Sequence, residues 1–356
     1  MPRQREQGRP ALYKYQGVKY YHFDVPPGVS YVLCANPWPF IIAWLRQNSP
    51  KKAPAKQFFD RAIYYAQLAS DFYATANISK YPIKGTLAYY GMLNLVKCYL
   101  SVSKVELEKE WEHHGLSLPL GRKYEIQVLK RDGGVSIFAE FCKLLGTSVR
   151  CSQIIQLKEI LSHIPELHEM AFSLGVLPWS RRKFLPVAID FTVNETKDKL
   201  FTRIRYQKKN ETRVDTSRFY KNSRKDYFNC AEVEGEWVVH RSKKRKNVTD
   251  ENFPAIYKNI QREYKEFELA SLLTRDGYKY YCDLRPSDFH HLCESLMLMF
   301  YLGSIARYRP TEVEALEASK YSPLTNEALS IIPKQFLYQL TSMITNSVCV
   351  VPQIKI

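Results

Sequence analysis

The hydrophobic pattern of the first half of the chain is helical. Between residues 54 and 78, apolar side chains recur at Phe58, Ala62 and Tyr65, the spacing of one helix face. Residues 82–100 are apolar around most of a helical circumference. This pattern predicts a central helix that is packed on several sides.

Shorter patterns continue in the same region and then change. We expect helices at 134–145 and 153–162 and another from Pro165, because proline is favoured in a first helical turn. From about residue 184, β-branched and aromatic residues alternate with charged or glycine-bearing turns, which is typical of strands. The predicted strands are 185–193, 199–206, 227–233, 236–241 and 278–284, with a helix at 254–272.

Helical patterning returns near the C-terminal end. Ser287 or Asp288 is expected to cap a helix that runs to about Tyr308 and is stopped by Pro310. Two further helices are expected after it, from about residues 311 and 324. The helices at 82–100 and 287–307 should pack together as the core. Gly91 and Gly303 would then allow them to approach closely.

These patterns predict a mainly α protein: a helical bundle core that carries a mixed α/β, strand-rich insertion. The expected regions are an N-terminal helical region (1–183), a basic strand-rich insertion (184–283) and C-terminal helices that complete the core (284–356).

The net charge of the chain indicates which classes of partner it could bind. The 356 residues include 52 Lys and Arg against 36 Asp and Glu, a formal net charge of +16, and 13% are aromatic. Such an excess favours polyanionic partners, either nucleic acid or an anionic membrane surface. The longest uncharged run, residues 25–45, is broken by Pro26, Pro27, Pro37 and Pro39, so we expect no membrane-spanning helix.

Half of this excess lies in one zone. Residues 203–246 contain 14 Lys and Arg and 6 Asp and Glu, a net +8. Aromatic side chains are interleaved with the cations, and such zones bind phosphates while the aromatic faces stack unpaired bases. The alternative is a solvated subdomain whose aromatics face inward. The candidate nucleic-acid-binding residues are Arg203, Arg205, Lys208, Lys209, Arg213, Arg218, Lys243, Lys244, Arg245 and Lys246; the interleaved aromatics are Tyr206, Phe219, Tyr220, Tyr227, Phe228 and Trp237.

Two histidine-containing motifs stand out. Arg285 and His290 have the Arg-x4-His spacing found in HEPN ribonucleases, where histidine moves a proton and arginine stabilises phosphorane charge. Helix capping and surface contacts are the alternative for this pair. The His113-His114-Gly115 sequence is expected to form a turn that needs glycine at its last position, because adjacent histidines do not share a helical face.

Common catalytic signatures are missing. The sequence has no GxxxxGK[ST], GxGxxG, GxSxG or HExxH motif, which argues against P-loop, Rossmann, α/β-hydrolase and zincin chemistry. The eight cysteines are scattered without a CxxC pair and are expected to be reduced, mostly buried residues of a cytoplasmic protein. We therefore expect no metal and no cofactor.

Several sequence blocks resemble the YaaC-like family. They are ASDFYATANISKYPIKGTLAYYGMLNLVKCYL followed by HHGLSL, then LKEILSHIPEL and LMLMFYLGSIARYRP, spread over about residues 38–345. The YYG and HHG order is also similar, more weakly, to HEPN-type helical bundles. The YaaC-like resemblance implies a mainly helical intracellular protein without an assigned reaction, and Arg285 and His290 are not among its features.

Three functions remain open at this level. The first is a subunit that binds RNA, single-stranded DNA or a protein partner, in a bacterial defence or stress complex. The second is a HEPN-like, metal-independent ribonuclease that uses Arg285 and His290. The third is a purely protein-binding scaffold whose charge serves only solubility. Neither the partner nor the oligomeric state follows from the sequence.

Overall fold

The computed structural model divides the chain into two compact units. The helical unit comprises Cys34–Trp179 and Ser287–Thr345; the sheet unit comprises Ser180–Pro286 and short segments that include residues 31–33 and 346–352. The described residues are 31–107, 111–131, 133–178, 182–193, 199–220, 226–229, 231–244, 246–249, 251–253, 255–256, 259–260, 267, 269–274 and 277–352.

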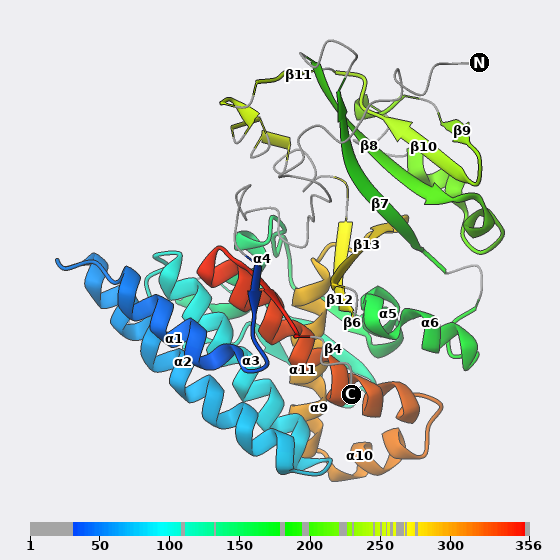
Figure 1. Ribbon diagram of the computed structural model, residues 1–356. Coiled ribbons are helices and arrows are strands. Elements are labelled where there is room, and N and C mark those ends of the chain that lie inside the picture. Colours follow the sequence, from blue (N-terminus) through cyan, green and yellow to red (C-terminus); the bar gives the residue numbers. More distant parts are fainter. Residues whose placement is uncertain are drawn as a thin grey trace. The chain divides into compact units, whose positions relative to one another are not determined.

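The helical unit is organised around α3 (Ile83–Val102), which packs against α2 (Ala55–Ile78), α9 (His291–Tyr308) and α11 (Ser322–Thr345) (Figure 1). Both α3 and α9 are buried on nearly every side, as their uniformly apolar sequences predict. The other helices are α1 (Pro37–Asn48), α4 (Ile137–Leu144), α5 (Leu157–His163), α6 (Pro165–Ser173) and α10 (Pro310–Glu317).

Two small sheets complete the helical unit. The parallel pair consists of β2 (Glu112–His113) and β5 (Val135–Ser136). The antiparallel sheet consists of β3 (Leu116–Ser117), β4 (Glu125–Val128) and β6 (Gln153–Gln156). The helix predicted at 153–162 is therefore wrong over its first four residues. The carboxylate of Glu159 accepts the backbone N–H of Gln156, so the helix begins only at Leu157.

The contact between α3 and α9 uses Gly303 as predicted, but not Gly91. A Cβ atom at Gly303 would lie 3.1 Å from the carbonyl oxygen of Gly85 and 3.1 Å from Cα of Thr86, so the two backbones nearly touch. Gly91 instead faces Tyr73 of α2. Both glycines permit close packing, and α3 simply has different neighbours on its different faces.

The start of α9 also differs from the prediction. The cap is His290, whose Nδ1 accepts the backbone N–H of Leu292 at 3.2 Å. The Ser287 hydroxyl accepts the N–H of Phe289 at 3.0 Å, which makes a turn ahead of the helix. Ser287 therefore acts one turn too early to cap α9.

The sheet unit is built on an antiparallel sheet in the order β12-β13-β7-β8-β10-β9, with β11 paired to β8. The strands are β7 (Phe184–Val193), β8 (Lys199–Gln207), β9 (Glu232–Glu234), β10 (Trp237–Arg241), β11 (Lys246–Asn247), β12 (Leu269–Thr274) and β13 (Gly277–Asp283). Separately, β1 (Tyr31–Leu33) pairs in parallel with β14 (Val348–Val350).

One strand occupies a position where a helix was predicted. The helix expected at 254–272 is wrong over 269–272, which belong to β12. The LASLLT sequence of β12 has no strong strand preference of its own, but it pairs along its whole length with β13 in a hairpin that closes at Thr274 and Gly277. Cross-strand pairing therefore outweighs local propensity here.

Candidate functional site

The two faces of the large sheet differ in burial along β8. Ile204 and Tyr206 are buried, whereas Arg203 and Arg205, which alternate with them, are partly buried, and the Arg203 side chain is 13% exposed. Directly paired residues of adjacent strands share a face. The partly buried face, called here the arginine face, carries Arg203, Arg205 and Gln207 of β8, Trp237 and Arg241 of β10 with the buried Val239 between them, and Glu232 and Glu234 of β9.

Arg203 and Arg241 on this face are held in ion pairs. Arg203 lies 3.5 Å from the carboxylate of Glu234, and Arg241 lies 3.7 Å from Glu234 and 3.8 Å from Glu232. Arg241 also packs over the ring of Phe201 at 4.9 Å. The acidic strand β9 therefore offsets part of the positive charge of β8 and β10.

The third arginine is stacked on an aromatic ring. The guanidinium carbon of Arg205 lies 4.8 Å from the ring centroid of Trp237, and both side chains belong to the arginine face. A cation on an indole face is stabilised electrostatically and by dispersion. The Arg205–Trp237 stack keeps a flat aromatic surface beside a positive charge.

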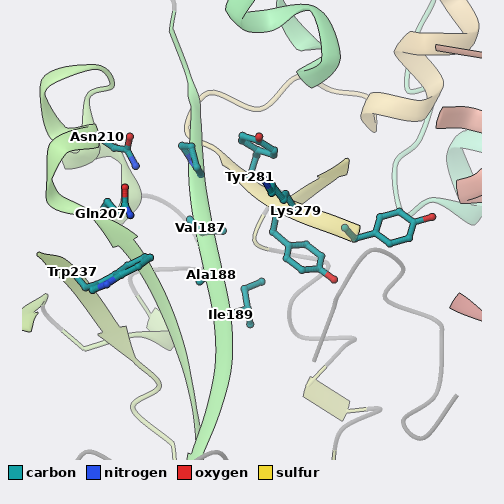
Figure 2. Close-up of a pocket in the computed structure, with 11 residues that line it drawn as sticks. Val187, Ala188, Ile189, Gln207, Asn210, Trp237, Lys279 and Tyr281 are labelled. Atoms are coloured by element: carbon teal, nitrogen blue, oxygen red, sulfur yellow. The ribbon is translucent and has the colours of Figure 1, made fainter. Parts of the chain in front are cut away.

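A pocket of about 490 Å³ adjoins this stack. Its lining comes from β7, β8, β10 and β13 and from Asn210 of the 3-10 helix η3 (Lys208–Thr212). Figure 2 shows Trp237 and Tyr281 on opposite sides of the β7 segment that contains Ala188, and Lys279 lines the same side as Tyr281. The full lining is Pro186, Val187, Ala188, Ile189, Gln207, Asn210, Trp237, Tyr278, Lys279, Tyr280 and Tyr281.

The remaining predicted cations lie at the two ends of β8. Lys208 and Lys209 begin the 3-10 helix η3 (Lys208–Thr212), and Arg213 follows it. At the other end, Lys243 and Lys244 follow β10, and Lys246 pairs with Leu200 in the β11–β8 ladder. The structure thus distributes these cations along the strand and does not gather them into one patch.

Two other predicted cations differ from this arrangement. Arg218, in the 3-10 helix η4 (Thr216–Tyr220), is paired at 2.9 Å with the carboxylate of Asp215. Arg245 lies outside the described residues.

Three of the six aromatic residues predicted to contact bases face the core instead. Tyr206, Phe219 and Phe228 are buried, and Phe219 stacks on the His240 ring at 4.1 Å between centroids. Burial lowers the pKa of His240 to about 4, so this histidine is neutral in its aromatic surroundings. The inward-facing alternative is correct for these three rings, whereas Trp237 lies on the arginine face. The side chain of Tyr220 lies outside the described residues.

The Arg285–His290 pair is split between the two units. Arg285 belongs to the sheet unit, where its backbone N–H donates to Asp283 and its carbonyl oxygen accepts from Lys183. His290 belongs to the helical unit and caps α9. Catalysis by this pair stays a prediction.

A second polar cluster in the helical unit brings three of the family-like sequence blocks together. The Tyr89-Tyr90-Gly91 block lies on α3, the His113-His114-Gly115 block begins at the last residue of β2, and the SIARY block ends α9. The Tyr89 hydroxyl and Nδ1 of His114 are 2.8 Å apart. Arg307 donates to the Tyr90 hydroxyl and packs over the Tyr90 ring at 5.0 Å.

The histidine turn is fixed in place by its backbone. Gly115 has φ +80°, as the predicted turn requires, and the carbonyl of His114 accepts the N–H of Phe138 at 3.2 Å. A Cβ at Gly115 would lie 2.3 Å from Oγ of Ser136, so no larger residue fits without a shift. The sequence indicated this turn but not its neighbours on α3 and α9. The available signal was the presence of polar Tyr, His and Arg side chains within otherwise apolar blocks.

A family model for the YaaC-like protein matches residues 41–344. The chain belongs to the YaaC-like family. The matched range includes both clusters described above, on the sheet unit and on the helical unit. No curated protein and no solved structure matches the chain, so the family name brings no assigned residue roles.

Metal sites and membrane spans are both missing from the described part of the chain. Within it, no three His, Cys, Asp or Glu side chains are grouped as a metal site requires. None of its helices combines the length and the apolar character needed to cross a membrane.

Proposed function

We propose that this YaaC-like protein binds single-stranded nucleic acid, RNA or DNA, along the arginine face of its sheet unit. The observation that carries the proposal is the Arg205–Trp237 stack at the edge of a pocket whose other side is formed by Tyr281. A cation beside flat aromatic surfaces suits an unpaired base with its phosphate.

The arrangement along β8 supports contact with several nucleotides. The strand has nine residues, which corresponds to a length of about 30 Å. Lysines flank it at both ends, and Lys208 is tied to the turn before Trp237 because its backbone N–H donates to the carbonyl of Glu236 at 2.8 Å. A backbone that follows the strand would place phosphates near the flanking lysines and bases near Trp237.

The carboxylates of β9 set the strength of this interaction. Glu232 and Glu234 already pair with Arg203 and Arg241, so a phosphate must compete with them for these two guanidinium groups. Binding should therefore be of moderate affinity and should weaken as salt is added. Base stacking on Trp237 does not face that competition, and we expect it to contribute a large share of the affinity.

Fluorescence anisotropy with a labelled single-stranded RNA or DNA of mixed sequence tests the proposal. Trp237→Ala should weaken binding about tenfold or more, since base–aromatic stacking contributes about 1–3 kcal/mol per base. Arg205→Gln should also weaken it, because it removes the cation that packs on Trp237.

The matched control is Tyr64→Ala, which removes a 60%-exposed aromatic side chain from α2 of the helical unit. Circular dichroism establishes that each variant is folded. Equal affinities of folded Trp237→Ala, folded Tyr64→Ala and the parent protein for both probes would refute the proposal. The same holds if the parent protein binds neither probe at low salt.

A further inference from the structure

The cluster formed by Tyr89, Tyr90, His114 and Arg307 in the helical unit depends on how α3 and α9 cross. Gly303 lies against the backbone of α3, and Oγ1 of Thr86 donates to its carbonyl oxygen at 3.1 Å. One turn further along the two helices, Tyr90 and Arg307 meet. The tight backbone contact therefore fixes the distance between the aromatic pair and the guanidinium.

Arg307 is a half-buried cation without a carboxylate partner among the described residues. Its donors reach the Tyr90 hydroxyl, the carbonyl of Gly303 at 3.0 Å and the hydroxyl of Ser304 at 3.4 Å. It also packs over the ring of Tyr308 at 4.8 Å. A guanidinium has five N–H groups, so these three hydrogen bonds leave donors for a ligand.

His114 adds a directed donor. The Tyr89 hydroxyl lies 2.8 Å from Nδ1 of His114 and fixes the orientation of the imidazole ring. Among the described residues, none is hydrogen-bonded to the other ring nitrogen, Nε2, which is not fully buried. In the protonated imidazole both nitrogens carry a proton, so Nε2 is then a donor for a ligand.

The charged surroundings of His114 favour an anion. The pKa of His114 is lowered by burial first, and then by the positive charges of Arg307 and Lys97 and by His113. Lys97 is itself paired with Glu112 at 2.6 Å, on the same short strand as His113. The Tyr90 ring brings His114 and Arg307 together, because its centroid lies 6.5 Å from that of the His114 ring and 5.0 Å from the guanidinium carbon of Arg307.

We propose that His114 and Arg307, held in place by Tyr89 and Tyr90, form a binding site for a phosphoryl group, either free phosphate or the terminal phosphate of a nucleotide. The forked guanidinium of Arg307 and Nε2–H of His114 would donate to its oxygens. A dianion offsets the charge of Arg307 and stabilises protonated His114. The site is in the helical unit and does not depend on the nucleic-acid binding proposed for the sheet unit.

Titration of the histidine imidazoles by NMR tests this site. The full chain is labelled with ¹⁵N-histidine, and the His114 signals are assigned by their loss in His114→Asn. Saturating inorganic phosphate, in a buffer without other phosphates, should raise the pKa of His114 by about one unit, as a neighbouring opposite charge does. Ionic strength is held constant with chloride.

Variants at Arg307 separate a ligand contact from a structural role. Arg307→Gln should weaken phosphate binding at least tenfold and should raise the pKa of His114 in the free protein, because one lowering charge is gone. Arg307→Lys keeps the positive charge but not the forked guanidinium, so its affinity for phosphate should lie between those of the parent protein and of Arg307→Gln. The control Arg122→Gln removes an arginine that is 59% exposed from the same unit and should leave both readouts unchanged.

Adenosine 5′-monophosphate and adenosine distinguish the two sources of the phosphoryl group. If the nucleotide shifts the His114 signals at lower concentration than phosphate does, and this depends on Arg307, the site binds a terminal phosphate. If the two ligands act at equal concentrations, the site binds free phosphate. The proposal is overturned if neither probe moves the His114 signals. It is also overturned if adenosine moves them as much as its phosphate does, or if folded Arg307→Gln responds as the parent protein does.

Discussion

Leu298, in the middle of α9, tests whether this helix is the structural centre of the helical unit. Its side chain is fully buried. Leu298→Ala removes three carbon atoms from a packed core, and such changes cost about 2–5 kcal/mol. Leu298→Asp would in addition bury an unpaired carboxylate. A domain is stable by only about 5–15 kcal/mol, so the aspartate variant should lose the native helical unit.

The expected shift in melting temperature follows from the size of the unit. For about 200 residues, 1 kcal/mol corresponds to about 2–4 °C, so Leu298→Ala should lower the melting temperature by about 6–12 °C at a cost of about 3 kcal/mol. Circular dichroism at 222 nm follows the transition. Leu120, which is 96% exposed, supplies the control: Leu120→Ala should stay within about 0.5 kcal/mol of the parent protein. Equal melting temperatures of the two alanine variants would refute this account of the core.

Two further predictions concern histidines. His240 has a pKa of about 4 in the folded protein against about 6.5 when unfolded, so the unfolded chain binds the extra proton. The free energy of unfolding should therefore fall by on the order of 3 kcal/mol as the pH drops from 6.5 to 4. Urea titrations should show a weaker dependence of this free energy on pH in His240→Phe than in the parent protein. The same pH dependence in both proteins would contradict this. His290→Ala should lower the free energy of unfolding by about 1 kcal/mol, because it removes the α9 cap. RNA incubated for an hour with the parent protein should stay intact on a gel. Metal-independent cleavage that both Arg285→Ala and His290→Ala abolish, with folding preserved, would instead establish the ribonuclease.

The helical core was largely predictable because its signals are local. The all-round apolar sequences of α3 and α9 can be buried only on several sides, and the structure places both helices in that way. Gly303 was correctly identified as a contact point. Gly91 was not, because a sequence shows which positions can come close but not which neighbour each of them meets.

The strand-rich region was predicted in outline only. The strands β7, β8, β10 and β13 carry β-branched and aromatic residues that indicate them directly. In contrast, β12 is specified by pairing with β13, a contact that no local pattern reveals.

The candidate sites show the same limit. Arg203 and Arg205 were identified from charge alone, but their acidic partners depend on the β10–β9 register. Tyr206 and Phe228 are aromatic residues within a basic zone, and composition could not show that they face the core. The cluster of Tyr89, His114 and Arg307 joins residues more than 200 positions apart in sequence, so only the packed helices reveal it.

The salt dependence of single-stranded RNA binding tests the central claim most directly. The affinity is measured from low to moderate salt for the parent protein and for a variant in which Lys243, Lys244, Arg245 and Lys246 are all changed to Ser. Each phosphate that the variant no longer neutralises should reduce the slope of log affinity against log salt by about 0.7. The account predicts weaker binding and a flatter slope in the variant for every sequence tested. If both proteins bind with the same affinity and the same slope, these cations serve only as a solvated surface, and the proposed path of the nucleic acid along β8 is wrong.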